Sequence, residues 1–149
     1  MEYAGFWRRA AAMSLDGVLL GVIQAVVNIL LIAMIGATSV AGGEPGDAAA
    51  VGTVGIVSLL SFIATWLYFA LMESSGKQAT LGKMMVGIVV SDLAGDRISF
   101  GKASGRYFGK IVSAILLMIG YLMAAFTKRK QALHDIMAGC LVIRKPKSA

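Results

Sequence analysis

The sequence predicts a mainly α-helical integral membrane protein with two full transmembrane helices, a short third helical segment and a small cytoplasmic β element. Three observations predict this class. Of the 149 residues, 58% are hydrophobic and only 15% are charged, whereas soluble domains are about 45–50% apolar and about 25% charged. Two long runs carry no charge at all, and the segment that joins them contains no lysine or arginine.

The two uncharged runs are Gly17–Ile35, with nineteen residues, and Val51–Met72, with twenty-two. A helix of about 20 apolar residues crosses the hydrocarbon core of a bilayer. We therefore expect helices over 10–35 and 51–72, joined by an external loop over 36–50, which is rich in glycine and holds a proline. The first run is longer than the ~7–15 apolar residues of a secretory signal peptide, so we expect no cleavage.

The basic residues indicate the orientation of these helices. All fourteen lie outside 36–50: two precede the first run, six follow the second run, and six lie in the tail at 127–149. Cytoplasmic segments of membrane proteins carry an excess of lysine and arginine. We therefore expect a multi-pass protein of the cell (inner) membrane, with the N-terminus, the loop 73–103 and the tail in the cytoplasm. This pattern also explains the net charge of +6 without a nucleic-acid partner.

A third apolar run, Ile111–Phe126, lies within a predicted helical segment over 104–126. Its sixteen residues span only ~24 Å as a helix, which is barely enough to cross. A single crossing would also export the six basic residues of the tail. We expect a re-entrant passage that bends near Gly120 and returns to the cytoplasm; full crossing is the alternative.

The cytoplasmic β element is predicted from three short segments rich in β-formers. Val86–Ser91 and Arg97–Phe100 flank a turn-like stretch at 92–96 and are expected to form a hairpin. Leu141–Ile143 is expected to add a third strand from the tail. A shared sheet requires both segments to lie on one side of the membrane, which agrees with a returning third passage.

The first helix carries a slanted polar stripe made of Arg9, Asp16, Gln24 and Asn28. A carboxylate in or near a membrane span is costly and normally faces a partner or a wet cavity. One interpretation is a cation or proton site with Asp16 as the ligand. The other is an interhelical clamp, in which Asp16 pairs with an arginine or lysine of a loop and the two amides bond to neighbouring helices.

Lys102, Arg106 and Lys110 recur at every fourth position among aromatic residues. This spacing favours an interfacial helix that binds anionic lipid headgroups, and a solvated basic face is the alternative. Further along the chain, His134 precedes Asp135, and such a pair is able to relay protons. With one histidine and one cysteine, no zinc site is expected. No nucleophile is visibly placed, so we expect no catalytic site, no cofactor and no enzyme.

Several of these residues resemble the signature of the RDD family of small prokaryotic membrane proteins. The first block of the resemblance is Tyr3–Arg9, followed by Ala12 and Asp16. The later blocks are Gly82 with Lys83, Gly95, Arg106, and Gln131–Asp135 with Gly139. The resemblance covers nearly the whole chain.

The resemblance implies that the arginine and two aspartates of the family name are Arg9, Asp16 and Asp135, with Arg8 as an alternative arginine. The chain departs from the family at Leu81, where proline is frequent, and at Cys140, where threonine is frequent. Neither departure touches the three named residues.

Two functions follow as expectations. In the first, the protein takes part in transport of cations, protons or small solutes as an oligomer: Asp16 binds a monovalent cation or proton, Arg9 tunes its charge, and Asp135 closes the site. In the second, it is a non-transporting scaffold or assembly module with a structural Arg/Asp/Asp charge network. The expected partners are anionic lipid headgroups and either a second copy or another membrane protein.

Overall fold

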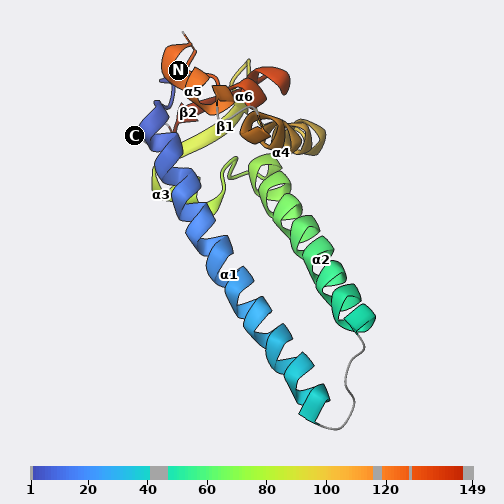
Figure 1. The fold of residues 1–149 in the computed structure, drawn as a ribbon. Coiled ribbons are helices and arrows are strands. Elements are labelled where there is room, and N and C mark those ends of the chain that lie inside the picture. Colours follow the sequence, from blue (N-terminus) through green and yellow to red (C-terminus); the bar gives the residue numbers. More distant parts are fainter. Residues whose placement is uncertain (1, 41–46, 116–118, 128, 146–149) are drawn as a thin grey trace. The chain divides into compact units, whose positions relative to one another are not determined.

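The computed structural model describes residues 2–40, 47–115, 119–127 and 129–145. The elements in chain order are α1 (Phe6–Val40), α2 (Asp47–Ser74), α3 (Leu81–Met85), β1 (Ile88–Asp92), α4 (Phe100–Ile115), α5 (Ile119–Phe126), α6 (Leu133–Met137) and β2 (Cys140–Arg144) (Figure 1). The chain divides into two compact units, one made of Met1–Asp16 with Trp66–Ala149 and the other of Gly17–Thr65.

The two long helices agree with the predicted spans but extend further. Among the described residues, Phe6–Met34 and Val51–Ser74 are long and apolar enough to cross a membrane. The predicted loop 36–50 is wrong in its described parts, because α1 continues to Val40 and α2 begins at Asp47. Three of the four glycines of 36–50 and its proline cluster at 42–46, whereas the three alanines that follow Asp47 are the strongest helix formers and extend α2.

Within the unit Gly17–Thr65, large apolar side chains are turned outward. Val22, Ile29 and Ile32 of α1 are 59%, 65% and 69% exposed, and Ile56 and Leu59 of α2 are 62% and 60% exposed. A soluble protein rarely exposes such a continuous apolar surface. A bilayer would cover these side chains.

The sheet joins segments far apart in the sequence. β1 pairs with β2 in antiparallel register, and the first residues of the chain add an edge, with an isolated bridge between Tyr3 and Ile143. Ala4 N donates to Val142 O at 2.9 Å. The start of the chain, the segment after α3 and the end of the described tail therefore meet in one sheet. The predicted strand at 141–143 is confirmed.

The predicted hairpin between Val86–Ser91 and Arg97–Phe100 is wrong. The turn itself exists: Asp92 N donates to Asp96 O at 2.9 Å. Residues 97–99 are not a strand, however, because the chain passes into α4 instead of turning back along β1. Ser99 precedes that helix, and its hydroxyl accepts from Lys102 N at 3.3 Å, as an N-cap serine does.

The third apolar segment is helical, as predicted, but consists of two helices, α4 and α5. Helix α4 starts at Phe100, four residues before the predicted 104. The interval between the two helices, 116–118, lies outside the described residues. Gly120 is the second residue of α5, directly after this interval, so the predicted bend near Gly120 stays a prediction.

Two segments of the same unit repeat one local structure. α6 and β2 begin at residues 133 and 140, each 52 residues after the starts of α3 and β1 at 81 and 88. Before each short helix stands a residue of positive φ, Gln78 at 52° and Lys130 at 49°. Between helix and strand stands a glycine of positive φ, Gly87 at 68° and Gly139 at 60°, a conformation that favours glycine.

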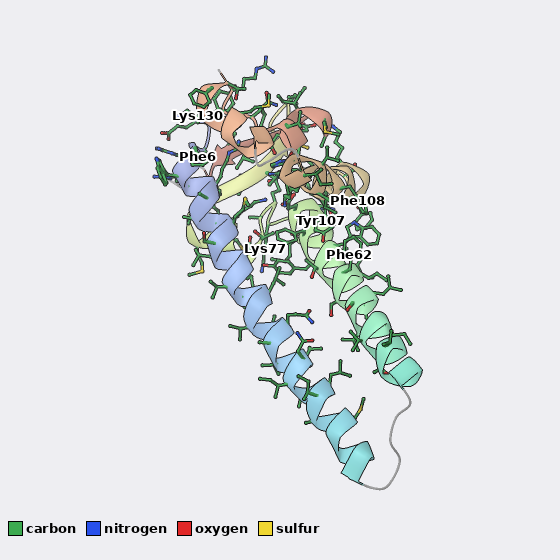
Figure 2. The ribbon with its side chains drawn as sticks, viewed as in Figure 1. Phe6, Phe62, Lys77, Tyr107, Phe108 and Lys130 are labelled. Carbon is green, nitrogen blue, oxygen red and sulfur yellow. The ribbon has the colours of Figure 1, made fainter. Side chains whose placement is uncertain are left out.

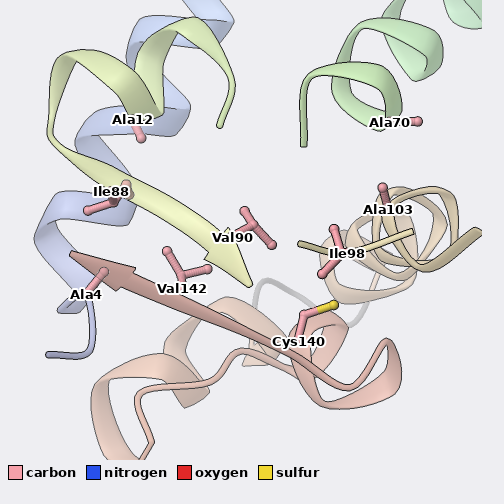
Figure 3. Packing of buried hydrophobic residues seen from close by; sticks show 9 residues of the cluster. All are labelled: Ala4, Ala12, Ala70, Ile88, Val90, Ile98, Ala103, Cys140 and Val142. Atoms are coloured by element: carbon pink, nitrogen blue, oxygen red, sulfur yellow. The ribbon is translucent and has the colours of Figure 1, made fainter. Parts of the chain in front are cut away.

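The strand register relates these two segments by a local two-fold axis. Val90 pairs with Val142, its counterpart 52 residues later, and the flanking pairs are reciprocal, Ile88 with Arg144 and Asp92 with Cys140. Figure 3 shows Val90 and Val142 on neighbouring strands at the centre of the core. Such reciprocity is the mark of two-fold symmetry.

The hydrophobic core lies around this sheet. Its buried members are mostly small and come from the start of the chain, α1, α2, both strands, α4 and the segment before α4 (Figure 3): Ala4, Ala12, Ala70, Ile88, Val90, Ile98, Ala103, Cys140 and Val142. Alanine at the helix positions lets the backbones approach the sheet closely. This close packing positions the polar side chains described next.

Candidate functional site

Asp135 forms the first centre of a buried charge network. It is fully buried at the start of α6, and its Oδ2 pairs with Nη1 of Arg9 from α1. Its Oδ1 accepts from Nε of Arg106, on α4, at 2.8 Å. The backbone N–H of Ala132 donates to Oδ2 at 3.2 Å and so caps α6. One carboxylate thus joins three helices. Of the two candidate arginines on α1, Arg9 belongs to the network, whereas Arg8 is exposed.

Glu73 is the second centre, and sequence reasoning missed it. It is 1% exposed near the end of α2. Its Oε1 pairs with Nζ of Lys83 and lies 3.3 Å from Nζ of Lys110, and its Oε2 lies 3.1 Å from Nη1 of Arg106. Arg106 therefore bridges Glu73 and Asp135. The sequence does contain a signal for it: Glu73 follows the uncharged run Val51–Met72 directly, and a carboxylate at the end of a membrane span usually has a partner.

Asp16 lies in a separate hydrogen-bonding site. Its Oδ1 accepts from the Tyr68 hydroxyl at 3.0 Å and from Gly82 N at 2.8 Å, and its Oδ2 accepts from the Thr80 hydroxyl at 2.5 Å. Arg9 pairs with Asp135 instead. The expected pairing of Asp16 with Arg9, or with a loop arginine or lysine, is therefore wrong within the described residues, because three uncharged donors take that place.

Gly82 shows how closely α3 approaches α1. A Cβ on Gly82 would lie 2.9 Å from Cγ of Asp16 and 3.0 Å from its backbone N, and closer still to the carbonyl oxygen of Ala12. The second repeat has a matching contact, in which a Cβ on Gly109 of α4 would lie 3.0 Å from Cβ of His134. Gly82 and His134 are counterparts, since 134 is 52 residues after 82.

This correspondence relates the two arginines of the network. Arg9 lies three residues before Ala12 on α1, and Arg106 lies three residues before Gly109 on α4. Ala12 is the residue of α1 that Gly82 of α3 approaches, and Gly109 is the residue of α4 that approaches His134 of α6. On both long helices the arginine therefore lies three residues before the contact with a short helix. The two arginines share this spacing, and their guanidinium groups converge on the single carboxylate of Asp135.

His134 lies beside the network in a buried position. Its Nδ1 is 3.4 Å from the Ser113 hydroxyl, and its Nε2 is 3.5 Å from Oδ1 of Asp135. Burial lowers the pKa of His134 to about 3. The nearby charges of Arg106 and Lys110 lower it further, and the opposing effect of Asp135 is too small to restore it. The imidazole is therefore neutral at physiological pH, which disfavours the proton relay that the sequence suggested.

The other predicted residues lie apart from the network or have different roles in it. Gln24 and Asn28 belong to the unit Gly17–Thr65, where Gln24 is half-buried and Asn28 is exposed. Lys102 is exposed on α4, so its headgroup role stays a prediction. Arg106 is 2% exposed, and Lys110 lies over the Phe69 ring at 4.1 Å and beside Glu73. The expected headgroup face is wrong for Arg106, because its partners are buried carboxylates.

Burial and charge shift the pKa values of the groups outside the spans. Burial raises the pKa of an isolated carboxyl, but Arg106 and Arg9 outweigh this and hold the pKa of Asp135 well below its usual range. Burial opposes the charge of Arg106, yet Asp135 and Glu73 raise its pKa. Lys83 differs: burial and the nearby Arg106 lower its pKa to about 7 despite Glu73.

A cavity of about 320 Å³ opens beside the network. The polar and charged residues that line it are Arg9, Ser14, Asp16, Lys83, Arg106, Lys110 and His134. Apolar side chains complete the wall, among them Phe6, Met13 and Phe69. Among the described residues, no group of three or more histidine, cysteine, aspartate or glutamate side chains could hold a metal ion.

Comparisons with known proteins give two relatives and one family. The sequence profile of the RDD family matches residues 3–139. The chain is 34% identical over 148 residues to the uncharacterized protein YxaI of Bacillus subtilis (strain 168), covering 95% of this chain and 97% of YxaI. It is 30% identical over 149 residues to the uncharacterized membrane protein YteJ of the same strain, covering 96% and 82%. No solved structure gives a significant match.

Proposed function

The chain belongs to the RDD family, and we propose that this helical membrane protein is a non-transporting assembly module, in which the buried charge network holds the ends of the membrane helices in one fixed arrangement. The observation that carries the proposal is the state of the three buried carboxylates. Asp135 and Glu73 are each paired with at least two cations, and Asp16 accepts from three uncharged donors. A cation or proton carrier requires a carboxylate that can exchange its partner.

The pattern of pairing supports a clamp in physical terms. Arg106 connects Glu73 of α2 with Asp135 of α6, and Arg9 of α1 also pairs with Asp135. Breaking a buried ion pair by removing one partner costs about 3–5 kcal/mol, because the other charge is left unpaired. Four elements are thereby tied together by charges that cannot separate cheaply. Rigidity of this kind suits a surface that must be presented in one form to a partner subunit.

The sheet supports the proposed topology. The start of the chain, β1 and β2 are joined by backbone hydrogen bonds, so the start of the chain, the segment after α2 and the described part of the tail belong on one side of the membrane. By the distribution of basic residues, that side is the cytoplasm. The third apolar run, Ile111–Phe126, would then enter the membrane from the end of α4 and return to the same side.

An aromatic cluster supports an interfacial position for α4. The Trp66 ring lies 5.9 Å from that of Phe100 and 6.0 Å from that of Phe108, and the Phe69 ring lies 5.9 Å from that of Tyr107. Figure 2 shows Tyr107 and Phe108 projecting from α4. Tryptophan and tyrosine gather at membrane–water interfaces, so the first part of α4, which carries these rings, would lie along the membrane surface near the cytoplasmic end of α2.

Solute or ion transport by an oligomer is the second candidate, because the 320 Å³ cavity is large enough for a small solute. The two functions are separated by reconstituting the purified protein in liposomes and imposing a proton or sodium gradient. We expect no flux above that of protein-free liposomes, and a reduced folded yield for Asp16→Asn, since the amide cannot accept all three hydrogen bonds. The exposed Asp96→Asn is the matched control.

The opposite result favours transport. In that case the wild-type protein supports a flux above background, and Asp16→Asn abolishes it at normal folded yield. An oligomer would also be required, because the described residues contain only two helices long enough to span.

A further inference from the structure

The cavity beside the charge network has a predominantly cationic polar wall. Four basic side chains line it, Arg9 from α1, Lys83 from α3, and Arg106 and Lys110 from α4. Glu73 and Asp135, which pair with them, are not among the lining residues. The four basic residues therefore line the cavity, whereas the two carboxylates that pair with them do not.

The charges of the site do not cancel. Four basic groups meet three carboxylates, those of Glu73, Asp135 and the lining residue Asp16, so one positive charge is in excess when Lys83 is protonated. The pKa of Lys83 is about 7, and a bound anion would favour its protonated form. The charge of Asp16 is further satisfied by its three hydrogen-bond donors. An uncompensated positive charge in a poorly solvated site attracts an anion and repels a cation.

Two of the basic groups retain hydrogen-bonding capacity. Nη2 of Arg9 is buried and has no hydrogen-bond partner among the described residues. The ammonium of Lys83 has three N–H donors, and its described hydrogen bond goes to Glu73. Buried donors without partners are rare in folded proteins, and each calls for a bound acceptor such as a water molecule or a ligand.

We propose that this cavity binds a phosphate-bearing ligand, with Arg9 and Lys83 donating to the phosphate oxygens and the apolar side chains Phe6, Met13 and Phe69 receiving the remainder. Guanidinium groups match the oxygens of phosphate in geometry, and lysine adds a compact charge. The volume lies at the lower end of the ~300–1,000 Å³ of small-molecule sites. This binding site is additional to the structural role proposed above, and its positive charge disfavours a cation as the ligand.

The phosphate has two sources that the same chemistry would serve, an anionic lipid headgroup or a soluble phosphate. Binding to the full-length protein in a neutral detergent would be measured by calorimetry with two probes. One is inorganic phosphate, compared with chloride at equal ionic strength. The other is short-chain phosphatidylglycerol, compared with phosphatidylcholine of the same chain length.

Two variants connect binding to the cavity. Lys83→Met removes one donor but leaves Glu73 paired with Arg106 and Lys110, and Arg9→Lys keeps a charge for Asp135 while removing the unpartnered Nη2. Each should weaken binding at least about tenfold, as expected for the loss of a charge-assisted hydrogen bond. Lys102→Met, an exposed change on α4, should leave the affinity unchanged.

Saturable binding of inorganic phosphate would support a soluble ligand, and binding of phosphatidylglycerol alone would support a lipid headgroup. The proposal is overturned if neither probe binds above its control, or if Lys102→Met weakens binding as much as the cavity variants do. Circular dichroism identifies variants that have not folded; the remaining variant then decides. Failure here leaves the structural role intact, whereas ion flux in liposomes would overturn that role without touching phosphate binding.

Discussion

Replacing Asp135 with asparagine tests the charge network at its centre. The change keeps the size of the side chain and removes its negative charge. Arg9 then loses its carboxylate, and Arg106 loses one of two. The side chains of these arginines are only 11% and 3% exposed, so water replaces the lost partner poorly.

The expected loss of stability depends on the partners that the two arginines keep. Arg106 keeps Glu73, and Nε of Arg9 keeps the carbonyl oxygen of Ala4 at 3.2 Å. We therefore expect the low end of the ~3–5 kcal/mol range for breaking a buried pair, about 3 kcal/mol. This corresponds to a shift of about two orders of magnitude in the unfolding equilibrium. The exposed Asp96→Asn should change stability by no more than about 0.5 kcal/mol.

The assay is unfolding in mixed micelles with increasing denaturing detergent, followed by far-ultraviolet circular dichroism. A double-mutant cycle with Arg9→Met isolates the Arg9–Asp135 term, since the two residues are in contact and their effects should not add. The reasoning that these charges are buried against one another would be refuted by two results together. The Asp135→Asn variant would be as stable as the Asp96→Asn variant, and the cycle would show no coupling energy between Arg9 and Asp135.

Three further predictions follow from the close contacts and the buried imidazole. Gly82→Ala should destabilise the protein by about 1–3 kcal/mol through overpacking against α1, whereas Gly76→Ala, with nothing within 4 Å, should not; thermal unfolding of the pair decides. Gly109→Ala should be destabilising, while Gly105→Ala on the same helix should be neutral or up to about 1 kcal/mol stabilising, and equal effects would contradict the α4–α6 contact. Because the pKa of His134 is lowered to about 3 from an unfolded value of about 6.5, the unfolded state binds more protons in this window, so stability should fall as pH drops from 6.5 towards 4, by up to about 1.4 kcal/mol per pH unit. His134→Gln should flatten this slope, and an unchanged slope would show that other groups cause it.

The sequence predicted the spans and part of the site because those features are local. Uncharged runs and the absence of basic residues from 36–50 identify α1 and α2 without any tertiary information. Arg9 and Asp135 were named through the family resemblance, and the structure brings them together. The strand at 141–143 was evident from its β-branched residues.

The missed features depend on contacts between distant segments. β1 was expected to pair with the next segment along the chain, but its partner lies 52 residues later, and the N-cap signal of Ser99 was the local clue against a strand there. Glu73 was passed over because it sits just outside an uncharged run, although Asp16 in the mirror position was noticed. The donors of Asp16 come from α2 and the segment at the start of α3, which no spacing within α1 could reveal.

The central claim is that Arg9, near the start of the chain, and Asp135, near its end, form one network on one side of the membrane. The most direct measurement places a reporter that is active on only one side of the membrane at each end of the chain in turn, before Met1 and after Ala149. The account predicts that both fusions report the same, cytoplasmic side. Reports from opposite sides would mean a full third crossing, which would separate Arg9 from Asp135 and contradict the network, the sheet and the cavity together.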